Sequence, residues 1–291
     1  MTILVTGATG LVGRHVVDQL VQAGESVRAL TRNPAKAGLP EGVEVVQGDL
    51  LQPASVVPAL DGVEKLFLFP QPETAAEVVD LAKQAGVRRI VVLSGAAVTL
   101  GFDTDYHARV ERAVEESGLE WTHVRPGEFM TNMLPIWGPM IKESRTVRYP
   151  FGDDLGGAPI HEADIAEVAV VALLEDKHVG QAYTLSGPEQ LTVRGQVEAI
   201  ADALGEEVRY EEVSREEARE ILKGMGGFAA ESADLLLGFV DYDGGAGSGD
   251  EGYSDQDYSE LMKPLPGFGL ATGKPGRTYA EWARDHVEDF R

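Results

Sequence analysis

Three glycines near the start of the chain have a spacing that suits phosphate binding. They follow the apolar run 2–6, and apolar residues then recur at helical spacing over 16–21. A strand, a glycine turn and a helix N-terminus together present backbone N–H groups and the positive end of a helix dipole to an anion. Gly7 permits the tight turn, Gly10 lets a pyrophosphate approach, and Gly13 lets the helix pack closely on the strand. The alternative is a tight turn without a ligand. The predicted cofactor contacts here are Gly7, Thr9, Gly10, Leu11, Val12 and Gly13.

The end of the second expected strand, 26–31, indicates which dinucleotide is bound. An acidic residue there would bind the 2′-hydroxyl of NAD, whereas an arginine accommodates the 2′-phosphate of NADP. Arg32 stands at that position, and no Asp or Glu lies between Ser26 and Arg32. We therefore predict NADP(H), with NADPH as the reduced form. The alternative is an ordinary exposed arginine in a loop.

Strands alternate with helical patterns over the first 125 residues. This alternation predicts an α/β fold, a Rossmann-type doubly wound parallel sheet with right-handed crossovers. Ligands bind at the carboxyl ends of the strands in such sheets, so the segments that follow the strands should converge on one crevice. Strands are expected at 2–6, 26–31, 43–47, 64–69, 87–93 and 120–124, with a helix at 74–85.

Residues at these strand ends complete the predicted site. Asp49 is a candidate partner for the adenine amino group, or alternatively a helix cap ahead of Pro53. The remaining cofactor contacts are expected at Leu50, Phe69, Pro70, Ser94 and Gly95. Substrate contacts are expected at Gln71, Ala96, Phe129, Met130, Met133 and Trp137.

Composition excludes several classes of function. The 291 residues include 48 acidic and 25 basic ones, a net charge of −23 that argues against nucleic acid. There is no cysteine, and the histidines lack ligand spacing, so no disulfide and no metal site is expected. No apolar run reaches the length of about 18 residues that spans a membrane. Because the first strand begins at residue 2, we expect no signal peptide and a cytoplasmic monomer or homodimer without a membrane partner.

The pattern changes beyond residue 130. We expect a dinucleotide-binding core at 1–130, to which 155–187 returns, and a substrate-binding lobe built from 131–154 and 188–291. The apolar run Met130–Met140 fits a mobile flap better than a regular helix, with packing between lobes as the alternative. The glycine-rich segment 241–258 is expected to be a flexible acidic loop. Later helices are expected at 164–174, 191–204, 216–223, 230–237 and 278–290, and strands at 181–185 and 208–213, the last of these in a small satellite sheet.

Through these features the chain resembles the atypical short-chain dehydrogenase/reductase superfamily, and most of all its NmrA-like branch. The resemblance rests on Gly7–Gly13, Arg32, Gly48-Asp49-Leu50 and the stretch 125–132 (RPGEFMTN), and it extends to 160–166, 183–188 and 279–282. It implies NADP(H) binding and a substrate lobe built from the later segments. The branch includes quinone and dye reductases, aromatic ketoreductases among related proteins, and cofactor-sensing regulators without known turnover.

The resemblance also implies a mechanism of proton transfer, and this chain lacks one of the residues that the mechanism uses. In the broader superfamily a Tyr protonates the carbonyl, a Lys four positions later lowers its pKa, and a strand-end Ser orients the substrate. Here Tyr106 is followed by Val110, so the ammonium group is missing. Ser94 occupies the expected strand end, where its alternative role is to cap the following turn.

A second proton donor is available on the same helix. His107 and Glu111 are four residues apart, so their side chains are expected to meet on one face. A carboxylate beside an imidazole orients it and favours its protonated form. The alternative is a surface pair without a catalytic role. The tentative catalytic residues are thus Ser94, Tyr106 and His107.

These observations predict an NADPH-dependent reductase that transfers a hydride to a quinone or polycyclic aromatic ketone. A quinone becomes an aromatic hydroquinone, and solvent can supply its protons, so the missing Lys matters less than it would for a simple ketone. Two alternatives stay open: a non-catalytic NADP(H)-sensing regulatory protein, and an isomerase or cyclase that retains its cofactor. The sequence contains no HExxH, Walker A or G-x-S-x-G motif.

Overall fold

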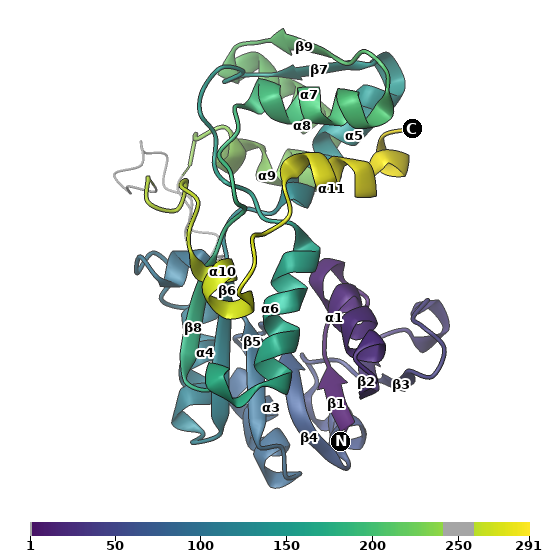
Figure 1. Cartoon of the computed structure of the whole chain (residues 1–291), viewed down its shortest axis with the longest axis vertical. Coiled ribbons are helices and arrows are strands. Elements are labelled where there is room, and N and C mark those ends of the chain that lie inside the picture. The colour runs from purple at the N-terminus through teal and green to yellow at the C-terminus, as the bar shows by residue number, and fades with distance from the viewer. Residues whose placement is uncertain (1, 241–258) are drawn as a thin grey trace. The chain divides into compact units, whose positions relative to one another are not determined.

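The computed structural model describes residues 2–240 and 259–291, which form two compact units (Figure 1). The first unit consists of 1–127, 162–185 and 266–274, and the second of 128–161, 186–265 and 275–291. The predicted flexible loop 241–258 lies outside the described residues. In the described part of the chain, no helix has the length and apolar character needed to cross a bilayer.

The first unit is built on a parallel sheet of seven strands in the order β3-β2-β1-β4-β5-β6-β8. This order reverses direction beside β1, which creates the switch point where ligands bind in doubly wound sheets. The Rossmann-type prediction is therefore confirmed. The strands are β1 Thr2–Val5, β2 Ser26–Thr31, β3 Glu44–Gln47, β4 Val63–Leu68, β5 Arg89–Leu93, β6 Glu120–Pro126 and β8 Gln181–Leu185.

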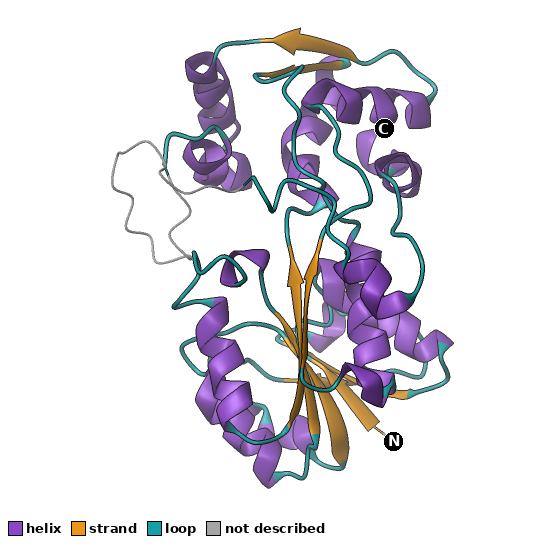
Figure 2. Cartoon of the chain, turned by 60° about the vertical axis from the view of Figure 1, so that its left-hand side comes forward, coloured by secondary structure: helices purple, strands orange, loops and turns teal. Residues whose placement is uncertain are grey.

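Helices cover both faces of this sheet, which Figure 2 shows edge-on. On one face α1 packs against α6, and α6 in turn contacts α10. On the other face, side chains of α2, α3 and α4 share one apolar cluster with the strands. Because both faces are covered, the central strands are largely buried, and all five residues of β5 are buried. The helices are α1 Leu11–Gln22, α2 Val57–Leu60, α3 Ala75–Gln84, α4 His107–Glu116, α6 Glu162–Leu174 and α10 Gly267–Thr272.

The second unit is mainly helical, with one small sheet. Its core surrounds Trp137, Tyr279, Trp282 and Phe290, each no more than 1% exposed. Strands β7 and β9 pair in parallel, which confirms the expected satellite sheet and supplies β7 as the partner that the sequence did not reveal. The elements are α5 Leu134–Ser144, β7 Thr146–Tyr149, α7 Val193–Leu204, β9 Arg209–Glu212, α8 Arg215–Met225, α9 Gly227–Leu236 and α11 Tyr279–Asp285.

The expectation of a mobile flap at Met130–Met140 was wrong. Met130–Met133 forms a 3₁₀ turn that continues directly into α5. Ile136, Trp137 and Ile141 bury one face of this helix, even though Pro139 lies inside it. Burial of this apolar face outweighs the cost of the lost backbone hydrogen bond at the proline.

Two buried cations hold the C-terminal end of α6 against the sheet. Arg89 is fully buried and donates to the backbone oxygens of Ala172, Leu173 and Glu175, and Lys65 donates to Leu173. Arg89 also pairs with carboxylates of Glu120 and Asp176 at 2.8 and 2.5 Å. Burial lowers the pKa of Lys65, and the neighbouring Arg89 lowers it further. The carbonyl groups and the negative dipole end of α6 stabilise these charges.

We expect Arg89→Met to destabilise the protein by about 2–4 kcal/mol, because several buried carbonyls lose their donor. The matched control is Arg88→Met, which changes a neighbouring arginine whose side chain is 45% exposed. The control should stay within about 0.5 kcal/mol of the parent protein. Thermal unfolding followed by circular dichroism measures both, and equal losses would contradict a structural role specific to Arg89.

Candidate active site

The turn between β1 and α1 depends on two glycines. Gly7 has a φ of +60°, in the left-handed region that glycine adopts at no steric cost. A Cβ atom on Gly13 would lie 2.1 Å from the backbone oxygen of Gly7, so no larger residue fits there. The helix therefore approaches the strand as closely as the predicted dinucleotide turn requires.

The N-terminus of α1 is open to a ligand. Gly10 is its N-cap, and no side chain accepts a hydrogen bond from the first turn. Thr9, Gly10 and Leu11 are exposed, whereas Val12 and Gly13 are buried beneath them. Exposed N–H groups at the positive end of a helix of 12 residues fit a phosphate group. The turn thus suits the pyrophosphate of a dinucleotide.

Arg32 follows β2 directly, on an exposed loop. Its guanidinium group makes no ion pair with a described residue, so it is available to an anionic ligand. Asp49 uses Oδ1 to accept from the backbone N–H of Leu51 at 3.0 Å, and its own N–H donates to Ser55. The carboxylate therefore stabilises a local turn rather than capping a helix, and the predicted adenine contact stays a prediction.

The end of β4 lies against the glycine turn. The Phe69 ring is 3.0 Å from the position that a Cβ on Gly7 would occupy, and Phe69 is 40% exposed. Thr6 fixes this contact, because its hydroxyl donates to the Phe67 oxygen and accepts from the Phe69 N–H. Pro70 follows and is buried, and the Gln71 amide donates to Glu73. Phe69 thus forms an apolar edge beside the phosphate turn.

Ser94 at the end of β5 belongs to a buried network. Its hydroxyl donates to Glu111, which also accepts two hydrogen bonds from Arg125, at 2.9 and 2.6 Å. Burial raises the pKa of Glu111, but these hydrogen bonds outweigh it and the pKa is lowered overall. The carboxylate stays ionised, and the hydroxyl proton of Ser94 is engaged with it rather than with a turn or a substrate.

Asp103, not Glu111, is the carboxylate beside His107. Nδ1 of His107 lies 2.6 Å from Oδ2 of Asp103, whereas Arg125 and Ser94 occupy Glu111, so the predicted His107–Glu111 pair was wrong. The reason is that each carboxylate has its own partners: Ser94 and Arg125 hold Glu111, and Asp103 lies in hydrogen-bond contact with His107. Asp103 also accepts from the backbone N–H groups of Tyr106 and His107, which holds it below the start of α4.

The His107 ring lies against the backbone at the end of β5. Its Cε1 and Nδ1 atoms are each 3.1 Å from the position of a Cβ on Gly95. Burial raises the pKa of Asp103, but the hydrogen bonds from His107 outweigh this and lower it. An ionised Asp103 keeps the proton on Nδ1 and leaves Nε2, which has no partner among the described residues, to exchange a proton.

Tyr106 packs edge-on against His107, with ring centroids 4.8 Å apart. Burial raises the pKa of Tyr106, and the negative charges of Glu73 and Asp103 raise it further. Val110 is fully buried in the apolar cluster between α4 and the sheet. The position of the usual Lys is therefore part of the core, and the phenol stays neutral near pH 7.

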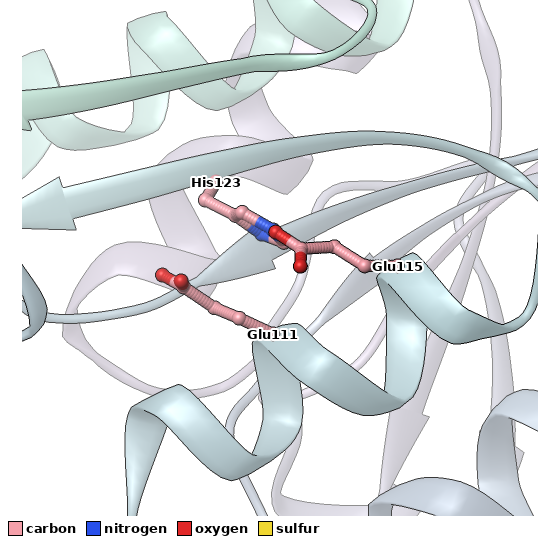
Figure 3. A group of neighbouring side chains, drawn as sticks. All are labelled: Glu111, Glu115 and His123. Atoms are coloured by element: carbon pink, nitrogen blue, oxygen red, sulfur yellow. The ribbon is translucent and has the colours of Figure 1, made fainter. Parts of the chain in front are cut away.

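Figure 3 shows a cluster of titratable side chains on α4 and β6, formed by Glu111, Glu115 and His123. Their possible ligand atoms lie within 4.8 Å of one another. Nε2 of His123 is 3.1 Å from Glu115, and Arg125 already pairs with Glu111. Protein groups thus already bond both carboxylates: Arg125 forms an ion pair with Glu111, and the His123 ring forms a hydrogen bond with Glu115.

Four of the predicted substrate contacts lie in the second unit. Phe129 pairs with Ile160 in a short bridge, and Met130 is buried in the core. Met133 and Trp137 line a cavity of about 280 Å³ within this unit. Of the two predicted contacts in the first unit, Gln71 is bonded to Glu73, and Ala96 is buried just after β5.

The structure adds residues that the sequence analysis did not select. Asp103 carries no recognisable motif, since it precedes the helix that it caps. Glu128 lines the cavity of the second unit, together with Tyr149 and Gln196. Glu128 lies within the stretch 125–132, which carried part of the family resemblance, but the signal marked the segment and not this side chain.

Comparison with known proteins identifies the family to which the chain belongs. The chain matches the NAD(P)H-binding family over residues 7–176. It is 37% identical to the (4-alkanoyl-5-oxo-2,5-dihydrofuran-3-yl)methyl phosphate reductase of Streptomyces griseus, over 99% of each chain. It is 34% identical to the NAD(P)H azoreductase of Xenophilus azovorans, again over 99% of each.

A solved structure agrees with the fold. The NADPH-dependent quinone oxidoreductase of Escherichia coli, solved in complex with NADPH, is 28% identical and superimposes with a TM-score of 0.76. The match covers 99% of this chain and all of the other. The chain belongs to the NAD(P)H-binding family, as its resemblance to the atypical short-chain dehydrogenases/reductases predicted, and is an NAD(P)H-dependent oxidoreductase.

Proposed function

We propose that this protein is an NADPH-dependent reductase of quinones or polycyclic aromatic ketones. The choice of acceptor rests on one observation: Val110 is buried in the core, at the position where the broader superfamily has a catalytic Lys. Without that Lys, Tyr106 is a poor acid at neutral pH. An acceptor that becomes aromatic or resonance-stabilised on reduction needs less help from a protein acid. Relatives named as an azoreductase and a quinone oxidoreductase support this class of acceptor.

The preference for NADPH rests on Arg32. The exposed guanidinium group follows β2, the strand end that meets the adenosine ribose in this fold. Guanidinium groups bind phosphate through paired charged hydrogen bonds, which a 2′-hydroxyl cannot replace. Crystallisation of the Escherichia coli quinone oxidoreductase with NADPH agrees with this assignment.

The Asp103–His107 pair supplies the proton in this proposal. Bound NADPH would supply a hydride, and the product oxygen then needs a proton. His107 holds this proton at Nε2, while Asp103 fixes the ring through Nδ1 at 2.6 Å. The lowered pKa of Asp103 keeps its carboxylate charged across the neutral range, so the contact that orients the His107 ring persists there.

Arg32→Ala should weaken NADPH binding about 10- to 100-fold, because a charged hydrogen bond to the 2′-phosphate is lost. NADH binding should change less than about 2-fold. Fluorescence titration of each cofactor measures both values. Arg109→Ala, which removes another exposed arginine of the first unit, is the control. Equal losses for NADPH and NADH would remove Arg32 from the 2′-phosphate site.

His107→Phe should lower kcat with an aromatic ketone about 100-fold, whereas kcat with a quinone should fall much less. Tyr106→Phe should change either rate less than about 3-fold, because the phenol does not supply the proton. Loss of NADPH absorbance in a panel of acceptors measures these rates. An unchanged ketone rate in His107→Phe would contradict the assigned role, and cofactor binding without turnover on any acceptor would favour a cofactor-sensing protein.

A further inference from the structure

The segment 32–38, which follows β2, carries two exposed cations, Arg32 and Lys36. Among the described residues, neither of these side chains forms an ion pair or a hydrogen bond. Although the net charge of the chain is −23, no acidic residue lies between Ser26 and Glu41. Local positive charge of this kind favours an anion, and the affinity depends on how firmly the cations are held before the anion binds.

Only a few contacts hold the first part of this segment. The side-chain amide of Gln47 on β3 donates to the backbone oxygen of Arg32 at 3.3 Å. The short 3₁₀ turn Pro34–Lys36 then follows, and no side chain caps its start. All residues of 32–36 are exposed. An exposed turn with few contacts opens readily, so the order of the segment depends on what holds its far end.

Arg14 of α1 holds that far end. Its Nη1 atom donates to the backbone oxygen of Gly38 at 2.8 Å, and Nη2 donates to that of Ala37 at 3.4 Å. Gly38 has a φ of +56°, in the left-handed region that favours glycine. The chain turns there, and two consecutive carbonyl oxygens meet one guanidinium group, whose fixed N–H groups suit two acceptors. Arg14 thus links the segment to the helix that begins at the phosphate turn.

The position of Arg14 in α1 also concentrates positive charge. Arg14 is the fourth residue of the helix, and the helix dipole disfavours a cation near a helix N-terminus. No carboxylate among the described residues pairs with it, and its two printed acceptors are neutral carbonyl groups. Its charge therefore adds to the positive end of α1. Such an arrangement is costly in the free protein and favourable when a phosphate group binds nearby.

We propose that Arg14 is a positioning residue for the choice of cofactor: it holds the segment 32–38 so that Arg32 and Lys36 meet the 2′-phosphate of NADPH. Because the segment is held at both ends, its cations lose little freedom when the phosphate binds. NADH has no 2′-phosphate and gains nothing from this order. The inference rests on the proposed role of Arg32 and extends it to a residue that acts through the backbone.

Fluorescence titration of the whole chain with NADPH and NADH tests the proposal. Arg14→Met keeps an unbranched side chain but removes both donors, and it should weaken NADPH binding about 10-fold and NADH binding less than about 2-fold. Arg14→Lys keeps a charged donor and should bind NADPH within about 3-fold of the parent protein. The matched control is Lys83→Met, which removes a cation of α3 that donates to the backbone oxygen of Ser117 at 2.6 Å. This control should change neither affinity.

Amide hydrogen exchange without cofactor tests the link itself. The backbone N–H groups of Lys36 and Ala37 donate to the oxygens of Asn33 and Pro34, each at 3.1 Å. In Arg14→Met these two groups should exchange at least about 5-fold faster, because the turn opens more often. Arg32→Ala should leave their exchange unchanged, since its side chain bonds no described part of the segment.

Three results would overturn the proposal: equal weakening of NADPH and NADH in Arg14→Met, unchanged NADPH binding, or unchanged exchange at Lys36 and Ala37. The NADH affinity of Arg14→Met reports whether the variant folds, and Arg14→Gln is the second variant if it does not. Failure of the Arg32 assignment has a different signature, because the parent protein would then bind NADPH and NADH alike. Since no reaction is measured, absence of turnover leaves this inference standing.

Discussion

The backbone oxygen of Gly7 occupies the space that a side chain at position 13 would need. This close contact between β1 and α1 sets the position of the first helix relative to the sheet. The exposed N-terminus of α1 then lies directly above the strand end, with no side chain capping it. Phe69 packs over the same turn from the end of β4. The backbone N–H groups at this helix start, which we expect to bind the phosphates of the cofactor, therefore owe their position to helix–strand packing.

Elsewhere in the first unit, two buried cations hold the C-terminal end of α6 against the sheet. Parallel sheets bury both faces, so a cation inside one needs acceptors close by. The carbonyl oxygens at the end of α6 provide them for Arg89 and Lys65. The same helix packs on α1 at the face of the sheet that carries the glycine turn. The two buried cations thus stabilise the layer on which the cofactor turn is built.

Two carboxylates near the start of α4, those of Glu111 and Asp103, have different hydrogen-bond partners. Glu111 accepts from Arg125 and Ser94, which makes it part of a closed ion-pair network. Asp103 accepts from backbone N–H groups and from His107, whose second nitrogen is left without a partner. Only in the second arrangement does a ring nitrogen stay without a partner among the described residues, and the proposed proton transfer depends on this difference.

Local sequence patterns determined the alternation of strands and helices over the first 125 residues, the glycine turn and the class of cofactor. These features depend on spacing within a few residues, such as three glycines after an apolar run. The tertiary structure alone decided which carboxylate faces His107, because the spacing rule for helices does not include Asp103, which precedes the helix. It also decided that Met130–Met140 forms an ordered turn and helix, since burial of Trp137 needs partners from distant segments. Glu128, Tyr149 and Gln196 meet at one cavity for the same reason: their proximity depends on packing between segments that no local periodicity records.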